Sequence, residues 1–242
     1  MSEQDKSCIV AQFRQFAALD DVECDLLLTL EQDARDFPAD TVLLRDGATA
    51  KHFFTLRSGW ACAIRELADG KRQVLDIFLP GQIMGLRDIG FSRNLTELRS
   101  ITPITACPFP RQRLTGIFNR APRLTDLFFL ILAREQSMLV ERVINIGRRN
   151  AAERLAHFLI EMKVRLNQAT NEFELPLNQS VIGDALSLST VHVSRTFGRL
   201  RRQGLIETRG ACIRIVDLER LIDFAGFDRT YLNIGSNWAR LD

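Results

Sequence analysis

The chain has 242 residues, of which 46% are hydrophobic and 26% are charged, as in an ordinary soluble globular protein. This length allows one large domain or two domains of ordinary size. The formal net charge of +2 excludes a basic coat over the whole surface, so any binding of nucleic acid must be concentrated in one patch.

No segment of the sequence is suited to a membrane or to export. The longest apolar run, residues 127–133, covers about two helical turns and is too short to cross a bilayer. The N-terminus MSEQDKSCIVAQF lacks the basic-then-apolar pattern of a secretion signal. We therefore expect a cytoplasmic protein without a membrane partner.

The first third of the chain changes from a helical to a strand pattern. Residues 9–33 predict short helices, with apolar side chains at Ile9, Phe13 and Phe16. From 36 to 113 short apolar or alternating runs follow at 41–44, 53–56, 61–64, 74–79 and 101–106, with glycines at 47, 59, 70, 81 and 85 between them. Turn signals at such regular intervals predict an antiparallel sandwich or barrel.

A long helix is predicted from residue 122 to 146. Leu132, Leu139 and Ile146 lie seven residues apart, which is typical of a two-stranded parallel coiled coil. We expect the dimer interface to comprise Phe128, Leu132, Met138, Leu139, Val143 and Ile146. The apolar stripe could also pack on its own chain, and the two interpretations are compatible. Glu135 and Arg142 near the seam could pair across the dimer.

The segment after this helix predicts a hinge and then further helices. Gly147 opens the run GRRN, where we place the hinge, and Asn150 with Glu153 forms a capping-box pattern for a helix over 151–166. A short strand is predicted over 173–177, and Asp217 is a candidate cap for a last helix. The tail from Phe227 is aperiodic, and the sequence does not say what it packs on.

Residues 177–203 predict a helix, a tight turn and a second helix. Asn178 and Ser189 are candidate N-caps, and the turn at 186–188 allows only two helices crossing steeply. Apolar residues at helical spacing form one face of each helix: Val181, Ile182, Ala185 and Leu186 on the first, and Val193, Phe197 and Leu200 on the second. Small and basic residues remain on the outer face of the second helix.

A β-hairpin is predicted directly after the second helix. Gly204 ends the helix, residues 205–208 form one strand, and the chain turns at Arg209-Gly210 into a strand over 211–215. From 190 to 215 there are six arginines, at 195, 199, 201, 202, 209 and 214, against one acid, Glu207. A winged helix-turn-helix with this charge predicts DNA binding, with Arg209 within reach of a phosphate. The alternative is that these basic residues form an ordinary solvated face.

Two runs of sequence resemble a known family. The run IGDALSLSTVHVSRTFGRLRRQGLI resembles the DNA-binding segment of the Crp/Fnr superfamily of bacterial transcription regulators, and RDGATAKHFFTLRSGWACAIRELADGKRQVLDIFLPGQIMG resembles the β-roll of cyclic-nucleotide-binding domains. The resemblance implies an α+β fold: a sensory β-roll with N-terminal helices over 1–121, a dimerisation helix over 122–147, and a winged helix-turn-helix with a C-terminal extension over 148–242. It also implies a homodimer, double-stranded DNA as ligand and RNA polymerase as a further partner.

The same resemblance assigns roles on the second helix of the motif. Arg195 matches the family's arginine that grips guanine O6 and N7. Many relatives have glutamate where this chain has Val191, which can rest against a thymine methyl but cannot accept a hydrogen bond from cytosine. His192 matches a phosphate contact. We expect the DNA-binding residues to be Ser189, Thr190, Val191, His192, Ser194, Arg195, Arg199 and Arg209.

In cyclic-nucleotide-binding relatives a glutamate beside the Gly85-type glycine takes the ribose hydroxyl, and a later Arg-Ser pair takes the phosphate. This chain has Leu86 in the place of the glutamate, and Arg99-Ser100 near the phosphate position. The effector residues suggested by the resemblance are Gly85, Arg99 and Ser100. Without the carboxylate we do not expect cyclic AMP binding, and a different small-molecule effector stays open.

The five cysteines do not form a metal-binding pattern. They lie at 8, 24, 62, 107 and 212, with at least fifteen residues between any two. The iron–sulfur relatives of the family need closely spaced N-terminal cysteines, so we expect no cluster here. Cys62 and Cys107 fall in predicted strands as small buried side chains, and Cys8, near the terminus, is the candidate for oxidation.

Two other classes of function are alternatives to DNA binding. The three histidines, at 52, 157 and 192, are scattered, and neither a phosphate loop nor a catalytic triad pattern is present, so we expect no catalytic residues and no enzyme. The second alternative is a ligand-binding or scaffolding protein whose winged helix contacts protein rather than DNA.

Overall fold

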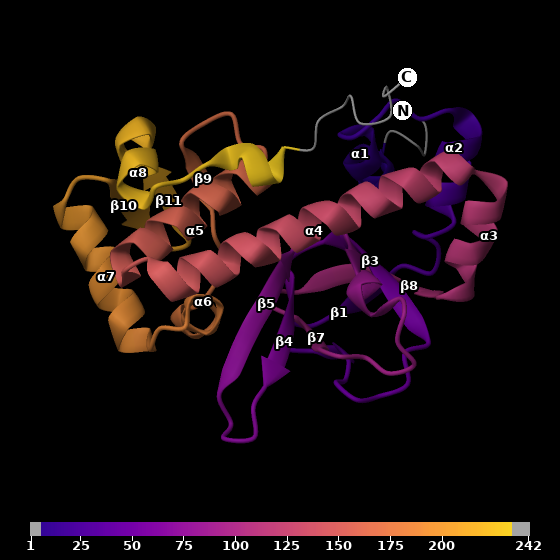
Figure 1. Cartoon of the computed structure of the whole chain (residues 1–242), viewed down its shortest axis with the longest axis horizontal. Coiled ribbons are helices and arrows are strands. Elements are labelled where there is room, and N and C mark those ends of the chain that lie inside the picture. The colour runs from indigo at the N-terminus through magenta and orange to yellow at the C-terminus, as the bar shows by residue number, and fades with distance from the viewer. Residues whose placement is uncertain (1–5, 234–242) are drawn as a thin grey trace. The chain divides into compact units, whose positions relative to one another are not determined.

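The computed structural model describes residues 6–233, which divide into two compact units. The first unit comprises residues 6–70 and 75–135, and the second comprises 71–74 and 136–233. The boundary falls inside one continuous helix, α4 (Pro122–Arg148), so that each unit contains half of it (Figure 1).

The first unit is built around two four-stranded antiparallel sheets. One has the strand order β1 (Arg35–Phe37), β8 (Ile104–Pro110), β3 (His52–Ser58), β6 (Ile83–Met84). The other has the order β2 (Val42–Leu44), β7 (Glu97–Ser100), β4 (Ala61–Glu66), β5 (Arg72–Phe78). The antiparallel strands expected from the glycine spacing and the roll implied by the resemblance are therefore confirmed.

Turn glycines hold the roll in shape, and Gly59 shows why a side chain cannot replace them. Gly59 has φ +77°, and an added Cβ would lie 2.3 Å from the carbonyl oxygen of Pro103. Both the backbone conformation and the close approach therefore require glycine between β3 and β4.

Helices cover one end of the roll and bury its aromatic core. α1 (Cys8–Arg14), α2 (Asp21–Leu28), α3 (Gln112–Arg120) and the start of α4 enclose a cluster in which Phe13, Phe53, Phe109 and Phe128 are at most 2% exposed. The ring of Phe128 lies 5.0 Å from that of Phe13 and 5.1 Å from that of Phe118. The first half of α4 therefore packs on its own roll.

This packing corrects part of the expected dimer interface. Phe128 and Met138 are 2% and 3% exposed and lie inside their own chain, and Leu132 packs against the core of the roll. Arg142, which could pair across the dimer, forms an ion pair with Glu161 of its own chain at 3.5 Å. Of the expected residues, Val143 is largely exposed, at 66%, while Leu139 and Ile146 are half-buried.

The second unit begins with the rest of α4 and a helix that its cap initiates. Asn150 and Glu153 form the expected capping box at the start of α5 (Ala151–Arg165). The break between the helices lies at residues 149–150, because α4 continues through Gly147 to Arg148. The break therefore lies within the predicted run GRRN, at its end and not at Gly147.

The remaining elements form a winged helix. α6 (Gln179–Leu186) and α7 (Thr190–Arg202) have the expected caps Asn178 and Ser189. β10 (Ile206–Arg209) and β11 (Cys212–Ile215) pair as a hairpin, and β9 (Glu172–Glu174) joins β11 on its other edge. α8 (Leu218–Ala225), capped by Asp217, and a 3₁₀ turn, η3 (Arg229–Leu232), follow. Among residues 6–233, no helix is long and apolar enough to cross a membrane.

Candidate nucleic-acid interface

A close approach of two backbone segments fixes the angle between α6 and α7. Gly183 lies on α6 where the carbonyl oxygen of Leu188 would be 2.4 Å from an added Cβ, and the amide of Leu188 donates to the carbonyl of Gly183 at 3.0 Å. Ile182 and Leu186 from α6 and Val193 and Leu200 from α7 are buried in the small core behind this turn. The outer face of α7 is thereby held away from the core.

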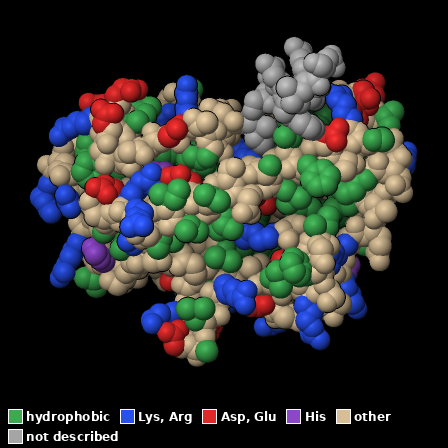
Figure 2. All heavy atoms as spheres, in the orientation of Figure 1, with side chains coloured by type: hydrophobic (Ala, Val, Ile, Leu, Met, Phe, Trp, Pro, Cys, Tyr) green, Lys and Arg blue, Asp and Glu red, His purple; other side chains and the backbone are tan. Residues whose placement is uncertain are grey.

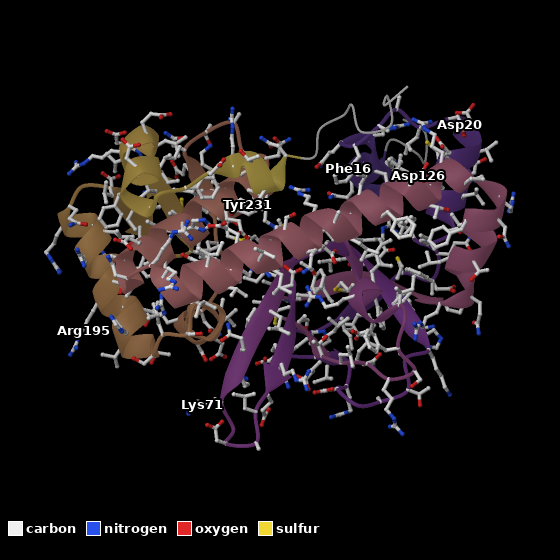
Figure 3. The ribbon with its side chains drawn as sticks, in the orientation of Figure 1. Phe16, Asp20, Lys71, Asp126, Arg195 and Tyr231 are labelled. Atoms are coloured by element: carbon white, nitrogen blue, oxygen red, sulfur yellow. The ribbon has the colours of Figure 1, made fainter. Side chains whose placement is uncertain are left out.

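The residues predicted to contact DNA share that outer face. Seven of them lie exposed at the N-cap or along α7: Ser189, Thr190, Val191, His192, Ser194, Arg195 and Arg199. The side chain of Arg195 points away from the protein (Figure 3). Thr196, at the buried edge of this face, is 4% exposed, and its hydroxyl donates to the carbonyl of His192 at 2.7 Å. The structure therefore brings these seven predicted residues onto one surface.

The wing carries the eighth predicted residue. Arg209 is the last residue of β10, is exposed, and precedes Gly210, whose φ is +62° at the turn. Arg214 on β11 forms an ion pair with Glu207 at 3.0 Å, so the single acid of this segment is already neutralised. The guanidinium of Arg201 donates to the hydroxyl of Thr208 at 3.0 Å and ties α7 to the wing.

The electrostatics of the surface follow from this pairing. Arg195, Arg199, Arg202 and Arg209 have neither an ion pair nor a hydrogen-bond partner within the part of the chain that the structure describes, and all four are exposed. Unneutralised guanidinium groups on one face produce the positive potential that attracts phosphates.

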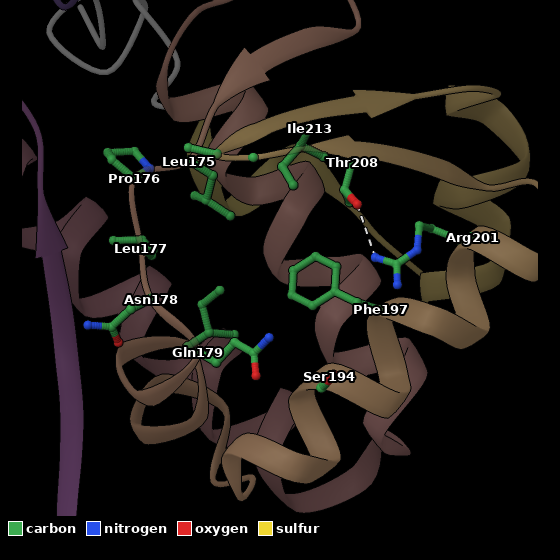
Figure 4. Close-up of a pocket in the computed structure, with 13 residues that line it drawn as sticks. Leu175, Pro176, Leu177, Asn178, Gln179, Ser194, Phe197, Arg201, Thr208 and Ile213 are labelled. Carbon is green, nitrogen blue, oxygen red and sulfur yellow. Dashed lines mark hydrogen bonds between the residues drawn. The ribbon is translucent and has the colours of Figure 1, made fainter.

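Two concave surfaces flank α7, one on each side. The wing-side cleft has a volume of about 470 Å³ and lies between α6, α7 and the hairpin; its lining includes Gln179, Ser194, Phe197, Arg201 and Thr208 (Figure 4). The second, the α5-side groove, has a volume of about 410 Å³ and is lined by Ala151, Ala152, Ser189, Val191, His192, Arg195, Thr196, Arg199 and Arg202. The sugar–phosphate backbone of a duplex could lie along either the wing-side cleft or the α5-side groove, beside α7.

Some residues of this surface were not predicted from the sequence. Gln179 and Thr208 line the wing-side cleft, and Ala151 and Ala152 bring the first turn of α5 to the other groove. The position of Gln179, directly after the cap Asn178, was the available signal, because the first turn of a helix presents free amide groups. The contribution of α5 depends on tertiary packing and had no local signal.

The expected effector residues are not brought together. Gly85 lines a cavity of about 10 Å³ in the roll, enough for at most one water molecule, whereas small-molecule sites measure hundreds of cubic ångströms. Arg99 instead forms ion pairs with Glu97 at 2.8 Å and Asp40 at 3.7 Å. The hydroxyl of Ser100 accepts from the amide of Thr41 and donates to the carbonyl of Pro38. Neither residue lines the cavity.

The residues after Gly85, which the resemblance places at the nucleotide site, are packed within the chain itself. Leu86 is 1% exposed, and Arg87 forms an ion pair at 3.5 Å with Asp76, which is 3% exposed. Asp88 is 2% exposed; burial raises the pKa of its carboxyl, and one oxygen accepts from the amide of Leu95 at 3.0 Å. A cyclic nucleotide does not fit these residues.

The cysteines behave as structural side chains. Cys62 and Cys107 are buried in β4 and β8 as expected, and burial raises the pKa of the Cys107 thiol to about 11. Cys8 is half-buried, its sulfur lies 3.3 Å from the carbonyl oxygen of Arg57, and burial raises the pKa of its thiol. This environment does not favour the thiolate, so the suggestion that Cys8 is readily oxidised lacks support. Within residues 6–233, no three His, Cys, Asp or Glu side chains are grouped to hold a metal.

Comparison with known proteins agrees with this geometry. Residues 153–224 match the model of the Crp-like helix-turn-helix domain, and residues 34–121 match that of the cyclic nucleotide-binding domain. The transcriptional activator protein FnrA of Stutzerimonas stutzeri is 27% identical over 224 residues, which are 91% of this chain and 92% of that protein. The fumarate and nitrate reduction regulatory protein of Escherichia coli K12 is 23% identical over 227 residues, covering 93% and 91%.

A solved structure has a similar fold over most of the chain. FixK2 from Bradyrhizobium japonicum superposes with a TM-score of 0.73 at 25% identity, covering 79% of this chain and 96% of FixK2. The fold of this chain is thus similar to that of FixK2 over most of both chains. The chain belongs to the Crp/Fnr superfamily and is a transcription regulator with a Crp-like helix-turn-helix DNA-binding domain.

Proposed function

We propose that this protein acts as a homodimer and recognises an inverted repeat in double-stranded DNA through residues 189–203. The observation that carries the proposal is the outer face of α7, where predicted base-contacting residues and three unpaired arginines are exposed together. A helix of this kind enters the major groove with its first turns against the bases.

Base recognition falls to the first turns of α7. Arg195 is exposed and points outward, so its guanidinium can form two hydrogen bonds to guanine, worth about 1–3 kcal/mol of discrimination. Val191 is 58% exposed one turn earlier and offers only apolar contact, which suits a thymine methyl. The half-site should therefore differ from those of relatives with glutamate at this position.

Phosphate contacts come from the two sides of the helix. Arg199 and Arg202 line the α5-side groove, while Gln179 and Arg201 line the wing-side cleft and Arg209 stands at the tip of the wing. Contacts to phosphates fix the position of the protein on the duplex and carry no sequence information themselves.

An exposed apolar stripe on α4 supports the homodimer. The exposed residues Phe129, Ala133, Gln136, Val140, Val143 and Gly147 follow one another at alternating intervals of four and three. We call this stripe the exposed seam; Phe129, Val140 and Val143 are 66%, 51% and 66% exposed. Figure 2 shows hydrophobic side chains on the surface along the course of α4. Such a heptad spacing suits a parallel two-stranded coiled coil.

The proposal extends to the regulatory signal and to a further partner. The filled roll favours a signal other than a cyclic nucleotide, and 1 mM cyclic AMP should leave the melting temperature unchanged, since a ligand that does not bind does not stabilise. Because the similar FnrA is named a transcriptional activator, RNA polymerase is the partner proposed for the bound dimer.

The test is selection of bound duplexes from a random pool, followed by measurement of affinity against salt. We expect an inverted repeat whose half-sites are about 34 Å apart, and affinity that falls steeply as salt increases. A protein-binding winged helix, the alternative function, would select no consensus sequence and would show little salt dependence towards duplex DNA. That outcome would refute the proposed function.

A further inference from the structure

The residues after α8 fold back onto the junction between α4 and α5. We call Phe227, Tyr231 and Leu232 with the turn between them the C-terminal strap. Tyr231 stacks on His157 of α5, with ring centres 6.0 Å apart and planes at 12°, and Phe227 lies 4.8 Å from the same histidine. Leu232 is 4% exposed. This assigns a packing partner to a segment whose role the sequence left open.

Polar contacts fix the position and orientation of the strap on the two helices. The hydroxyl of Tyr231 donates to the carboxylate of Glu161 at 3.0 Å, and the second oxygen of Glu161 lies 3.5 Å from both Arg142 of α4 and Arg165 of α5. Glu161 is 3% exposed. One buried carboxylate therefore connects the strap with both helices that meet at the junction.

Arg149, in the break between α4 and α5, makes the second connection. Its Nε donates to the carbonyl of Ala225 and its Nη2 to that of Gly226, both at 3.1 Å, and its Nη1 lies 2.8 Å from Glu141 of α4. Gly226 ends α8 with φ +55°, so its carbonyl is one of the helix's free acceptors. The end of α8 is thereby tied to the last turns of α4.

These contacts fix an angle in a way that apolar packing alone does not. Hydrogen bonds and ion pairs between buried groups hold only at particular distances and directions, and a displaced partner leaves an unsatisfied charge. Helices that meet only through apolar side chains can shift between neighbouring packing arrangements with a smaller loss of free energy. Asn145, 4% exposed on α4, adds a further bond to the carbonyl of Arg154 at 3.3 Å.

We propose that the C-terminal strap, held in place by Tyr231 and by the contacts of Arg149 with the end of α8, sets the angle between the C-terminal half of α4 and the winged helix. This angle would determine the spacing of half-sites that a dimer accepts. The inference rests on the proposed function, because spacing has meaning only for two recognition helices on one duplex. A displacement of about 3.4 Å along the DNA axis changes the preferred spacer by one base pair. Tyr231 and Arg149 are positioning residues, since neither lies on the DNA-binding surface.

The experiment measures affinity for a set of duplexes that carry the selected half-sites with spacers shortened by one base pair, unchanged, or lengthened by one or two. The wild type should prefer one spacer at least about tenfold, since misplaced contacts lose 1.4 kcal/mol or more. In Tyr231→Ala and Arg149→Ala the preference should fall to about threefold or less, while affinity for an isolated half-site and its salt dependence stay unchanged. Arg229→Ala, exposed on the same turn, is the matched control and should keep the preference.

Tyr231→Phe is included in case Tyr231→Ala fails to fold. It keeps the aromatic stack and removes only the hydroxyl bonded to Glu161. It should weaken the spacer preference in the same direction. Folded Tyr231→Phe and Arg149→Ala with the full wild-type preference would overturn the inference while leaving the proposed function intact. A wild type with no preference for any inverted repeat would refute the proposed function itself.

Discussion

At the scale of single residues, Arg195 separates recognition of sequence from attraction to phosphate. We expect Arg195→Ala to reduce affinity for the selected repeat by about 1–3 kcal/mol per subunit, with unchanged dimerisation. Arg195→Lys keeps the charge but loses the two-pronged geometry, so it should retain the salt dependence and lose discrimination at the contacted guanine. Fluorescence anisotropy with the selected repeat and single-base variants measures both effects. Unchanged affinity of the Arg195→Ala protein for the selected repeat would contradict the assignment of Arg195 to a guanine contact.

His157 is a second residue whose environment has a measurable consequence. It is 1% exposed, and burial together with the nearby Arg149 guanidinium lowers its pKa, although Glu141 at 3.1 Å and Glu161 act in the opposite direction. The rings of Phe227 and Tyr231 complete its surroundings, and the pKa of Tyr231 is raised by burial, so its hydroxyl stays protonated as a donor. The buried imidazole is therefore held neutral.

This lowered pKa predicts loss of stability in acid. Below about pH 6.5 the unfolded chain binds a proton at His157 that the folded chain still excludes, so the free energy of unfolding decreases as the pH falls towards the folded pKa. One such group contributes a slope of at most about 1.4 kcal/mol per pH unit. His157→Gln should make the slope shallower in urea titrations between about pH 5 and 7. Parallel slopes for the two proteins would contradict the assignment.

At the scale of elements, the turn of the helix-turn-helix depends on Gly183. Alanine is the better helix former by about 1 kcal/mol, but its Cβ would lie 2.4 Å from the backbone oxygen of Leu188, which cannot move without opening the turn. Gly183→Ala should therefore destabilise the protein by about 1–3 kcal/mol. Gly198→Ala in α7 is the matched control, because its Cβ meets only the ends of flexible side chains, Arg202 at 3.2 Å and Arg201 at 3.9 Å. Thermal and urea unfolding measure the stability of both variants. If Gly198→Ala were the less stable of the two, the close approach of Gly183 to Leu188 would be relaxed in solution.

The wing makes a separate prediction. Arg209 is exposed at the tip and unpaired within the described chain, so Arg209→Ala should weaken binding to all duplexes alike. The plot of log affinity against log salt should become shallower by about one unit for each subunit. Arg220→Ala on α8 removes the same charge from outside both concave surfaces and should leave the slope unchanged. Equal slopes for the Arg209 variant and the wild type would place the wing away from the duplex.

Elements with strong local signals were predicted, and those that depend on distant partners were not. The caps Asn150, Asn178, Ser189 and Asp217 act as the sequence indicates, because capping involves only the next few residues. β1, β6 and β7 were missed: they have two to four residues each, and β1 pairs Phe37 with Ile104, far along the chain. α3 was missed although Leu114 and Ile117 are buried on one face of it, because Arg111 at its start supplies no side-chain cap to mark where it begins.

At the scale of the whole molecule, the candidate DNA-binding surface was predictable and the exposed stripe of α4 was not. The outward face of α7 follows from a 3.6-residue period and the position of its cap, both of which are local. The period of α4 likewise suggests a heptad seam, but it cannot say which of two adjacent stripes of its first half packs on the roll. The pairing of Phe128 with Phe13 and Phe118 decides this, and it leaves the stripe one residue further along exposed.

The exposed seam gives the last prediction. Val140→Glu places two carboxylates against each other in a parallel dimer, where burial without a partner should weaken association by about 3–5 kcal/mol, a hundredfold or more. Sedimentation at micromolar concentration should show a monomer that binds an isolated half-site but has lost the preference for the inverted repeat. Val22→Glu, at a 56% exposed valine on α2, makes the same chemical change away from the seam and should remain dimeric. A dimeric Val140→Glu protein would mean that the two copies meet through another surface, because buried opposed carboxylates are incompatible with this one.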